Sequence, residues 1–227
     1  MSASRCLGLV GGLGIGATVH YYEKLARAHE AQSRTLHLVI THAEISRVFR
    51  YARTDDRDGL AEYLAGYIRR MQAAGAEVAA IPAVTPHLCV RELMAISPLP
   101  LVSIFEPLVE ELRARAVRRA VIFGTRFVME SSLFGQLPDV EIIPSRPEEM
   151  DYIHNTYNEL ARTGKASKQQ HAQLTALAHT LVRRDEVDTI ILAGTDFALL
   201  FHPTNTDFPN LDCAALHLRE ILKRLLE

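Results

Sequence analysis

The fold is decided by the stretch VAAIPAVTPH, residues 78–87, in which a short apolar run turns polar at once. A second stretch, TIILAGTD at residues 189–196, repeats this plan far downstream. Each reads as a buried strand that ends in small residues, followed by a threonine and an ionisable side chain. Ligands of parallel α/β sheets bind beyond the carboxyl ends of the strands. The two stretches therefore predict a site built from two related halves of the chain.

The composition favours a globular protein and disfavours nucleic-acid binding. The chain has 227 residues, of which 48% are hydrophobic and 23% charged, so it is long and apolar enough for a sizeable core. Its formal net charge is −2, whereas a nucleic-acid-binding surface needs clustered basic residues. No apolar run approaches the roughly 20 residues of a membrane span. We expect no nucleic-acid partner and no membrane partner.

The cysteines indicate a reducing compartment. There are three, Cys6, Cys89 and Cys213, without CxxC or metal-ligand spacing. A sparse, odd number argues against a disulfide scaffold, and burial in the core is the expected role for all three. The first residues do not read as a signal peptide. The sequence predicts a cytoplasmic location and no metal site, because the ten histidines show neither HxH nor HExxH spacing.

A glycine-rich turn, GGLGIG at residues 11–16, follows the first predicted strand. Glycines permit positive φ and a close approach of the backbone to a ligand, and the helix that follows offers its N-terminus to an anion. Gly12, Gly14 and Ala17 fit a variant dinucleotide fingerprint, but no acidic ribose partner is evident after the second strand. A small carboxylate bound by the same amides needs fewer assumptions.

Strands and helices alternate along the chain, which predicts an α/β fold with mainly parallel sheets. The expected strands are 6–10, 36–40, 78–81, 101–104, 120–123, 140–144 and 189–193, and the expected helices are 17–32, 59–74, 88–95, 106–116, 147–163, 168–184 and 213–226. The polar segment 44–58 is either a cover over the site or a solvated loop and helix start. Unit 7–18 resembles 120–134, and 78–88 resembles 189–200, which indicates a degenerate internal duplication.

Several motifs, in the right order, resemble the aspartate/glutamate racemase superfamily over nearly the whole chain. The superfamily includes aspartate, glutamate and hydantoin racemases, maleate isomerase and arylmalonate decarboxylase. The matching segments are Gly11-Gly12-Leu13-Gly14 with Ala17-Thr18, Thr85-Pro86-His87, Phe123-Gly124-Thr125, Ala193-Gly194-Thr195-Asp196, and Pro209 with Asp212. The resemblance implies two pseudo-symmetric three-layer α/β subdomains with the active site in a cleft between them. It also implies cofactor-independent chemistry and a homodimer.

The expected subdomains are residues 1–105, joined by the closing helix 208–227, and residues 106–207. In the racemases of this superfamily, two cysteines stand on opposite faces of the substrate α-carbon, one removing a proton and the other returning one. Carrying the motifs over places Ala83 and Gly194 at these two positions. Neither side chain can move a proton. We hypothesise that they leave empty space that admits a bulkier substrate or a water.

Two other ionisable residues are candidates for the acid/base role. Histidine ordinarily titrates near neutral pH, which suits His87 to this role; alternatively, His87 caps a helix or supports a binding residue from behind. Asp196 is either an acid/base or the residue that orients Thr195, and a helix N-cap is its plainer interpretation. The candidates for binding a substrate carboxylate are Gly12, Thr18, Arg47, Thr85, Thr125, Arg126, Lys165 and Thr195. A lid role falls to the loop that carries His202 and Asp207, and His42 and Glu44 end a strand on the site side.

The sequence leaves three functions open. The first is an isomerase or lyase acting on a small amino acid or carboxylic acid, with His87 and Asp196 in place of the thiols. The second is a racemase that uses an unusual pair of acid/base side chains. The third is a non-catalytic carboxylate-binding or regulatory protein on the same fold.

Overall fold

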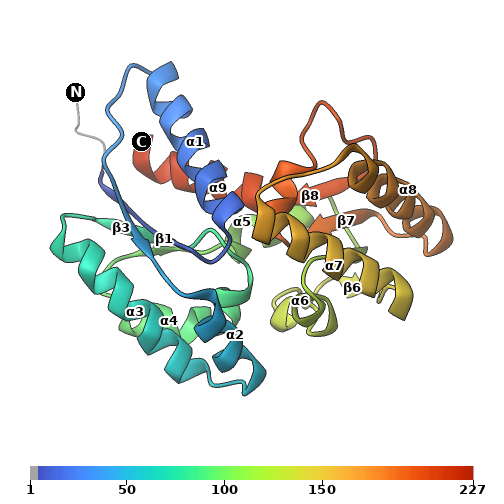
Figure 1. Ribbon diagram of the computed structural model, residues 1–227, viewed down its shortest axis with the longest axis horizontal. Coiled ribbons are helices and arrows are strands. Elements are labelled where there is room, and N and C mark those ends of the chain that lie inside the picture. Colours follow the sequence, from blue (N-terminus) through green and yellow to red (C-terminus); the bar gives the residue numbers. More distant parts are fainter. Residues whose placement is uncertain (1–4, 227) are drawn as a thin grey trace. The chain divides into compact units, whose positions relative to one another are not determined.

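The computed structural model describes residues 5–226, which divide into two compact units (Figure 1). Unit 1 holds residues 5–104 and 217–226, and unit 2 holds residues 105–216. The expected division fell after residues 105 and 207. Each unit contains one sheet of four parallel strands. The α/β fold predicted from the sequence is confirmed.

Unit 1 is built on the strand order β2-β1-β3-β4. Its strands are β1 (Leu7–Gly11), β2 (Leu38–His42), β3 (Val78–Ala80) and β4 (Leu101–Val102). Its helices are α1 (Ile15–Ala31), α2 (Ile45–Arg53), α3 (Arg57–Ala73), the 3₁₀ helix η1 (Thr85–Cys89), α4 (Val90–Ile96) and the part of α9 (Cys213–Leu226) from residue 217 onward. All residues of β1 and β3 are buried, as expected for central parallel strands covered by helices.

Unit 2 repeats this arrangement in the strand order β6-β5-β7-β8. Its strands are β5 (Arg119–Phe123), β6 (Glu141–Ile142), β7 (Thr189–Leu192) and β8 (Asn210–Asp212). Its helices are α5 (Phe105–Ala114), α6 (Arg126–Glu130), η2 (Leu133–Gly135), α7 (Pro147–Thr163), α8 (Lys168–Arg184), η3 (Thr195–Leu199) and the first turn of α9. The shared order places β1 with β5 and β3 with β7, in agreement with the predicted internal duplication.

The structure differs from the sequence prediction in three segments. The polar segment 44–58 contains a nine-residue helix, α2, which buries the side chains of Val48 and Ala52. Strand β8 was not expected, because three residues that include Asn210 and Asp212 carry no apolar alternation. The resemblance of 120–134 to 7–18 predicts a helix after Thr125, but this helix has only five residues and ends at Glu130, two residues before Ser132, which takes a left-handed conformation.

Both decisive stretches follow the carboxyl end of a central strand. In unit 1, β3 ends at Ala80 and leads through Ala83 into η1. In unit 2, β7 ends at Leu192 and leads through Gly194 into η3. In the same sheet β5 pairs with β7, and its last residue, Phe123, is in register with Leu192. Candidate site residues are therefore carried on turns that the buried strands hold in place.

Candidate active site

Asp196 and Tyr157 form a buried hydrogen-bonded pair in unit 2. Asp196 lies in the first turn of η3 and is fully buried. Tyr157 comes from α7, and its hydroxyl donates to Oδ2 of Asp196 at 3.2 Å. The N-cap position of η3 belongs to Gly194, so the simple capping interpretation of Asp196 is wrong. The carboxylate instead has a phenol as a proton-bearing neighbour.

Tyr157 occupies the space beside Gly194. A Cβ built on Gly194 would lie 2.3 Å from Cε2 and 2.5 Å from Cδ2 of the tyrosine ring. The ring also packs against Phe197, with 5.2 Å between the ring centroids. The hypothesis of empty space at this position is therefore wrong, because an aromatic side chain from α7 fills it. The sequence carried no sign of this, since nothing in α7 distinguishes Tyr157 from a core residue.

The environment keeps the Tyr157 phenol protonated. Burial raises its pKa well above the ordinary value, and the negative charge of Asp196 raises it further. A protonated phenol remains a hydrogen-bond donor to the carboxylate at neutral pH. The pair thus combines a proton acceptor and a proton donor at the end of β7.

Thr125 and Thr195 follow neighbouring strands and lie at the same edge of the unit 2 sheet. Thr125 caps α6 by accepting a hydrogen bond from the Val128 amide at 3.3 Å. Its neighbour Gly124 approaches the other strand end, because a Cβ there would lie 3.4 Å from the Ala193 carbonyl oxygen. Both threonines are buried. Their hydroxyls remain candidates for binding a carboxylate near the Tyr157–Asp196 pair.

The predicted cationic residues of unit 2 are placed less favourably. Arg126 pairs with Glu130 at 3.1 Å and also contacts Asp151, so these carboxylates already compensate its charge. Lys165 is exposed in the turn between α7 and α8. In the loop 200–208, Asp207 pairs with His179 at 2.9 Å. The substrate role of Arg126 and Lys165 and the lid role of this loop stay predictions.

His87 in unit 1 is buried with both ring nitrogens bonded to the backbone. Nδ1 lies 2.8 Å from the Ala83 carbonyl oxygen, and Nε2 accepts from the Ile104 amide at 3.3 Å. Since a carbonyl only accepts, Nδ1 carries the proton. Burial lowers the pKa of His87 to about 4, and the bond to Ala83 opposes this shift. This geometry fits a histidine that holds the backbone of this turn in place better than an acid/base role.

A second buried histidine, His217, completes this network. The centroids of the His217 and His87 rings are 6.0 Å apart. Nε2 lies 3.0 Å from the Val102 carbonyl oxygen, and Nδ1 lies 3.1 Å from the Tyr21 hydroxyl. The carbonyl again fixes the proton, on Nε2, so Tyr21 donates to Nδ1. Burial first, and then the neighbouring His87, lower the pKa of His217 to about 3.

The two histidines predict a loss of stability in mild acid. Their folded-state pKa values of about 4 and about 3 lie below the unfolded value of about 6.5. Their contribution is present above pH ~6.5 and is lost as the pH falls, because the unfolded chain then binds more protons. Asp212 opposes this, since burial raises its pKa to about 6. We expect a net loss of about 2 kcal/mol in the free energy of unfolding between pH 7 and pH 5, measured by urea titration.

The variant Asp212→Asn isolates the histidine contribution. Asp212 accepts from the amides of Ala214 and Ala215 at 2.8 and 3.3 Å, and asparagine can cap in the same way. Without the opposing carboxyl group, the decrease in the free energy of unfolding between pH 7 and pH 5 grows to about 4 kcal/mol. A free energy of unfolding that stays constant or increases over this range in both proteins would contradict the assignment of neutral, buried histidines.

The glycine-rich turn of unit 1 is closed by its own hydrogen bonds. The Gly12 amide donates to Oγ1 of Thr18 at 3.2 Å, and this hydroxyl donates to the Gly14 carbonyl at 2.8 Å. Gly12 has φ +83°. The turn thus uses the Gly12 amide and the Thr18 hydroxyl internally, and their predicted role in substrate binding is untested.

Gly12 and Gly75 both have positive φ, but only Gly12 also lacks the space for a side chain. A Cβ on Gly12 would lie 2.4 Å from the Ala43 carbonyl oxygen, whereas one on Gly75, which has φ +94°, would meet nothing within 4 Å. We expect Gly12→Ala to lower the free energy of unfolding by about 2 kcal/mol or more, and Gly75→Ala by about 1 kcal/mol. Equal effects in chemical denaturation would contradict the close approach at Gly12.

Arg47 on α2 contacts aromatic rings. Its guanidinium lies 4.5 Å from the centroid of the Tyr63 ring, and the hydroxyls of Tyr63 and Tyr67 are 3.1 Å apart. The Tyr63 hydroxyl also accepts from the Glu44 amide at 2.8 Å. These contacts attach α2 to α3 and explain why the polar segment is ordered. Arg47 remains a candidate for binding a carboxylate.

The cysteines do not supply the thiols that the motifs lack. Cys89 and Cys213 are buried, and burial raises both thiol pKa values, that of Cys89 to about 12. Cys6 is only partly buried, so its predicted place in the core is wrong; it precedes β1 and its amide donates to Glu77 at 2.8 Å. Within residues 5–226, no group of three or more potential metal ligands is found. No helix in this range is long and apolar enough to cross a membrane.

Comparison with known proteins identifies the family. Residues 10–221 match the family model described as Asp/Glu/Hydantoin racemase. The chain belongs to this family. The resemblance inferred from the sequence motifs is thereby confirmed over nearly the whole chain. No curated protein sequence matches the chain significantly.

Solved structures of racemases share the fold. An aspartate racemase homologue from Pyrococcus horikoshii OT3 is 21% identical, with a TM-score of 0.80 over 98% of this chain and 100% of its own. Aspartate racemase from Picrophilus torridus is 15% identical, with a TM-score of 0.75 over 96% and 93% of the two chains. Glutamate racemase from Francisella tularensis, in complex with D-glutamate, is 12% identical, with a TM-score of 0.62 over 98% and 81%. These likenesses concern the fold.

Proposed function

We propose that this member of the racemase family acts on a small amino acid or carboxylic acid, without a cofactor, through the Tyr157–Asp196 pair. The observation that carries the proposal is the position of Tyr157. Its ring fills the space beside Gly194, where the family motif places a cysteine, and its hydroxyl donates to the buried Asp196. A proton donor and a proton acceptor thus stand at the end of β7, where a thiol is missing.

The proposed chemistry is acid/base catalysis from one face of the substrate. Asp196 accepts a proton from the carbon next to the substrate carboxylate, and the Tyr157 hydroxyl holds the Asp196 carboxylate in position through its hydrogen bond. The other cysteine position of the family motif is matched by Ala83, whose methyl group cannot return a proton. The proton therefore goes back to the face it left, or a bond to a leaving group breaks instead.

Two outcomes follow from a single acid/base pair. In an exchange reaction, the C–H bond breaks and re-forms on the same face, so the substrate keeps its configuration. In a lyase reaction, a carbon–carbon or carbon–heteroatom bond breaks, and where the carbanion is protonated it takes its proton from this pair. The second reaction is that of a lyase, whereas the first exchanges hydrogen without forming an isomer, and both differ from two-thiol racemisation. The hydroxyls of Thr125 and Thr195 are proposed to bind the substrate carboxylate, because charge-assisted hydrogen bonds to an anion are strong.

Incubation in deuterated water tests the proposal. The substrates are aspartate, glutamate and related dicarboxylates, including malonates with one substituent, and both deuterium incorporation and new products are measured by NMR. We expect exchange without loss of configuration, or a new product, from at least one substrate. Racemisation at a rate equal to exchange would contradict single-face chemistry.

A non-catalytic carboxylate-binding protein is the second candidate. The observations in its favour are the methyl group of Ala83 and the full occupation of both His87 ring nitrogens, which leave unit 1 without a proton-transfer group at the motif position. This candidate predicts binding of a dicarboxylate in calorimetry with neither exchange nor product. The same set of substrates therefore separates the two functions.

A further inference from the structure

We propose that the groove between α1 and β2 is a binding site for a small primary amine that carries an apolar group. The site lies within unit 1 and is independent of the proposed function. Three observations carry the proposal: an apolar groove of about 580 Å³, a buried histidine nitrogen without a hydrogen-bond donor, and a carboxylate without an ionic partner at the same end of α1.

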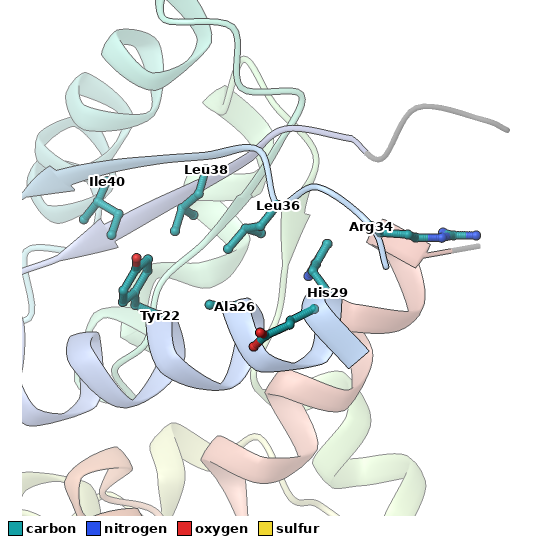
Figure 2. Close-up of a pocket in the computed structure, with 8 residues that line it drawn as sticks. Tyr22, Ala26, His29, Arg34, Leu36, Leu38 and Ile40 are labelled. Atoms are coloured by element: carbon teal, nitrogen blue, oxygen red, sulfur yellow. The ribbon is translucent and has the colours of Figure 1, made fainter. Parts of the chain in front are cut away.

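The two walls of the groove are apolar. Leu36, Leu38 and Ile40 lie on one side, because alternate side chains of an extended segment point to the same face. Figure 2 shows them opposite Tyr22 and Ala26 of α1. Tyr22 is 52% exposed and Ile40 is 45% exposed. A ligand with an apolar group between these walls would remove their surface from water.

His29, in the last turn of α1, supplies a hydrogen-bond acceptor to this groove. Its Nδ1 lies 2.8 Å from the Leu25 carbonyl oxygen. Since a carbonyl only accepts, Nδ1 carries the proton, and Nε2 of the neutral ring keeps a lone pair. His29 lines the groove but is only 1% exposed, and no donor within residues 5–226 reaches Nε2. Buried polar atoms are nearly always hydrogen-bonded, so His29 favours a ligand that brings an N–H group.

Glu30 places a negative charge beside this acceptor. It is exposed, lines the groove, and its carboxylate forms no ion pair or hydrogen bond with any residue that the structure describes. His29 and Glu30 also stand at the C-terminal end of a 17-residue helix, where the carbonyl groups carry partial negative charge. The histidine lone pair, the carboxylate and the helix end all favour a cation.

Arg34 does not convert the groove into an anion site. Its guanidinium donates to the Leu226 carbonyl at the end of α9, a common way for arginine to satisfy the last carbonyls of a helix. In Figure 2 its side chain extends away from Tyr22 and Ala26. A primary ammonium group therefore matches the groove best, because its N–H groups can donate to His29 and Glu30 while the rest of the ligand covers the apolar walls.

This site is separate from the candidate active site. Helix α1 follows the carboxyl end of β1 and runs back to the start of β2, so its last turn lies at the amino end of these parallel strands. The turns that carry His87 and Asp196 follow the carboxyl ends of β3 and β7. We therefore expect the amine to bind without displacing a substrate of the proposed reaction.

Titration of the full chain with 2-phenylethylamine, followed by two-dimensional NMR of the backbone amides, tests the site. We expect saturable shifts centred on residues 22–40, with a Kd of about 1 mM or below. The neutral 2-phenylethanol and the anionic 3-phenylpropanoate should each bind about tenfold more weakly, because neither brings a charged donor. Equal or tighter binding of either compound, no binding of the amine, or shifts centred elsewhere would overturn the proposal.

Two variants test the polar contacts. His29→Asn retains a donor for the Leu25 carbonyl and removes Nε2, and it should raise the Kd of the amine about tenfold. Glu30→Gln removes only the charge of an exposed side chain and should raise the Kd at least about threefold. Glu62→Gln removes the same charge from α3 and should leave the Kd unchanged.

Thermal unfolding of each variant shows whether the fold is retained. Since Glu30 is exposed, Glu30→Gln decides the outcome even where His29→Asn does not fold. A folded Glu30→Gln variant that binds the amine as tightly as the wild-type chain would overturn the assignment of this groove to an amine.

Discussion

Replacing Asp196 with asparagine is expected to lower kcat/KM by about 100-fold or more on whichever substrate the chain turns over. Asparagine has the same shape and can still accept the hydrogen bond of Tyr157, but it cannot take a proton. General acid/base groups typically contribute factors of about 10² to 10⁴. The loss should fall on kcat with little change in KM, because the carboxylate acts on the transition state. Steady-state kinetics on the purified variant measures it.

Tyr157→Phe and Tyr152→Phe complete this test. The first removes only the hydroxyl that holds the Asp196 carboxylate in position, and we expect a loss of about tenfold in kcat. The second removes a hydroxyl from the same helix that bonds Gln173 at 2.7 Å, and it should leave kcat unchanged. Thermal unfolding of the three variants shows whether the fold is retained. Full activity of a folded Asp196→Asn variant would rule out the proposed acid/base role.

Restoring the cysteine of the family motif at Gly194 is expected to destabilise the fold. The new Cβ would lie 2.3 Å from the Tyr157 ring, and this ring is enclosed in the core of unit 2. Overpacking a well-packed core typically costs 1–3 kcal/mol, occasionally more. Because the contact is with a rigid ring, we expect Gly194→Cys to lower the free energy of unfolding by about 3 kcal/mol. Urea titration measures this loss.

A double-mutant cycle assigns the loss to Tyr157. In Tyr157→Ala the ring is absent, so Gly194→Cys in that background should cost at least about 2 kcal/mol less than in the wild type. Gly66→Cys is the control, since a Cβ at Gly66 meets nothing within 4 Å, and it should change stability by less than about 0.5 kcal/mol. Additive effects of the two core substitutions would contradict the packing of the ring against Gly194.

The sequence predicted the fold because its elements are locally consistent. The helices 147–163, 168–184 and 213–226 coincide with α7, α8 and α9. Ser167 illustrates why, since it accepts from the Gln170 amide at 3.1 Å and Gln170 caps in return. Helix α2 was left undecided because its order comes from the packing of Arg47 on Tyr63, a contact between residues 16 positions apart.

The candidate site was predicted less completely, because its chemistry depends on contacts between distant residues. The motifs located Ala83, Gly194 and Asp196 on the correct strand ends. They could not show that Tyr157, 39 positions from Asp196, fills the space beside Gly194. Nor could they show that burial and two backbone bonds hold His87 neutral. A side chain's type gives its ordinary pKa, whereas its protonation in the fold follows from burial and partners.

The stereochemical course of hydrogen exchange tests the central claim most directly. The wild-type chain is incubated with each enantiomer of its substrate in deuterated water, and deuterium content and enantiomeric composition are followed together. Acid/base chemistry confined to the Tyr157–Asp196 pair predicts deuterium incorporation with retained configuration, or a product of a single configuration. Deuterium incorporation that accompanies full racemisation would show that a second group acts from the opposite face, and it would contradict the account.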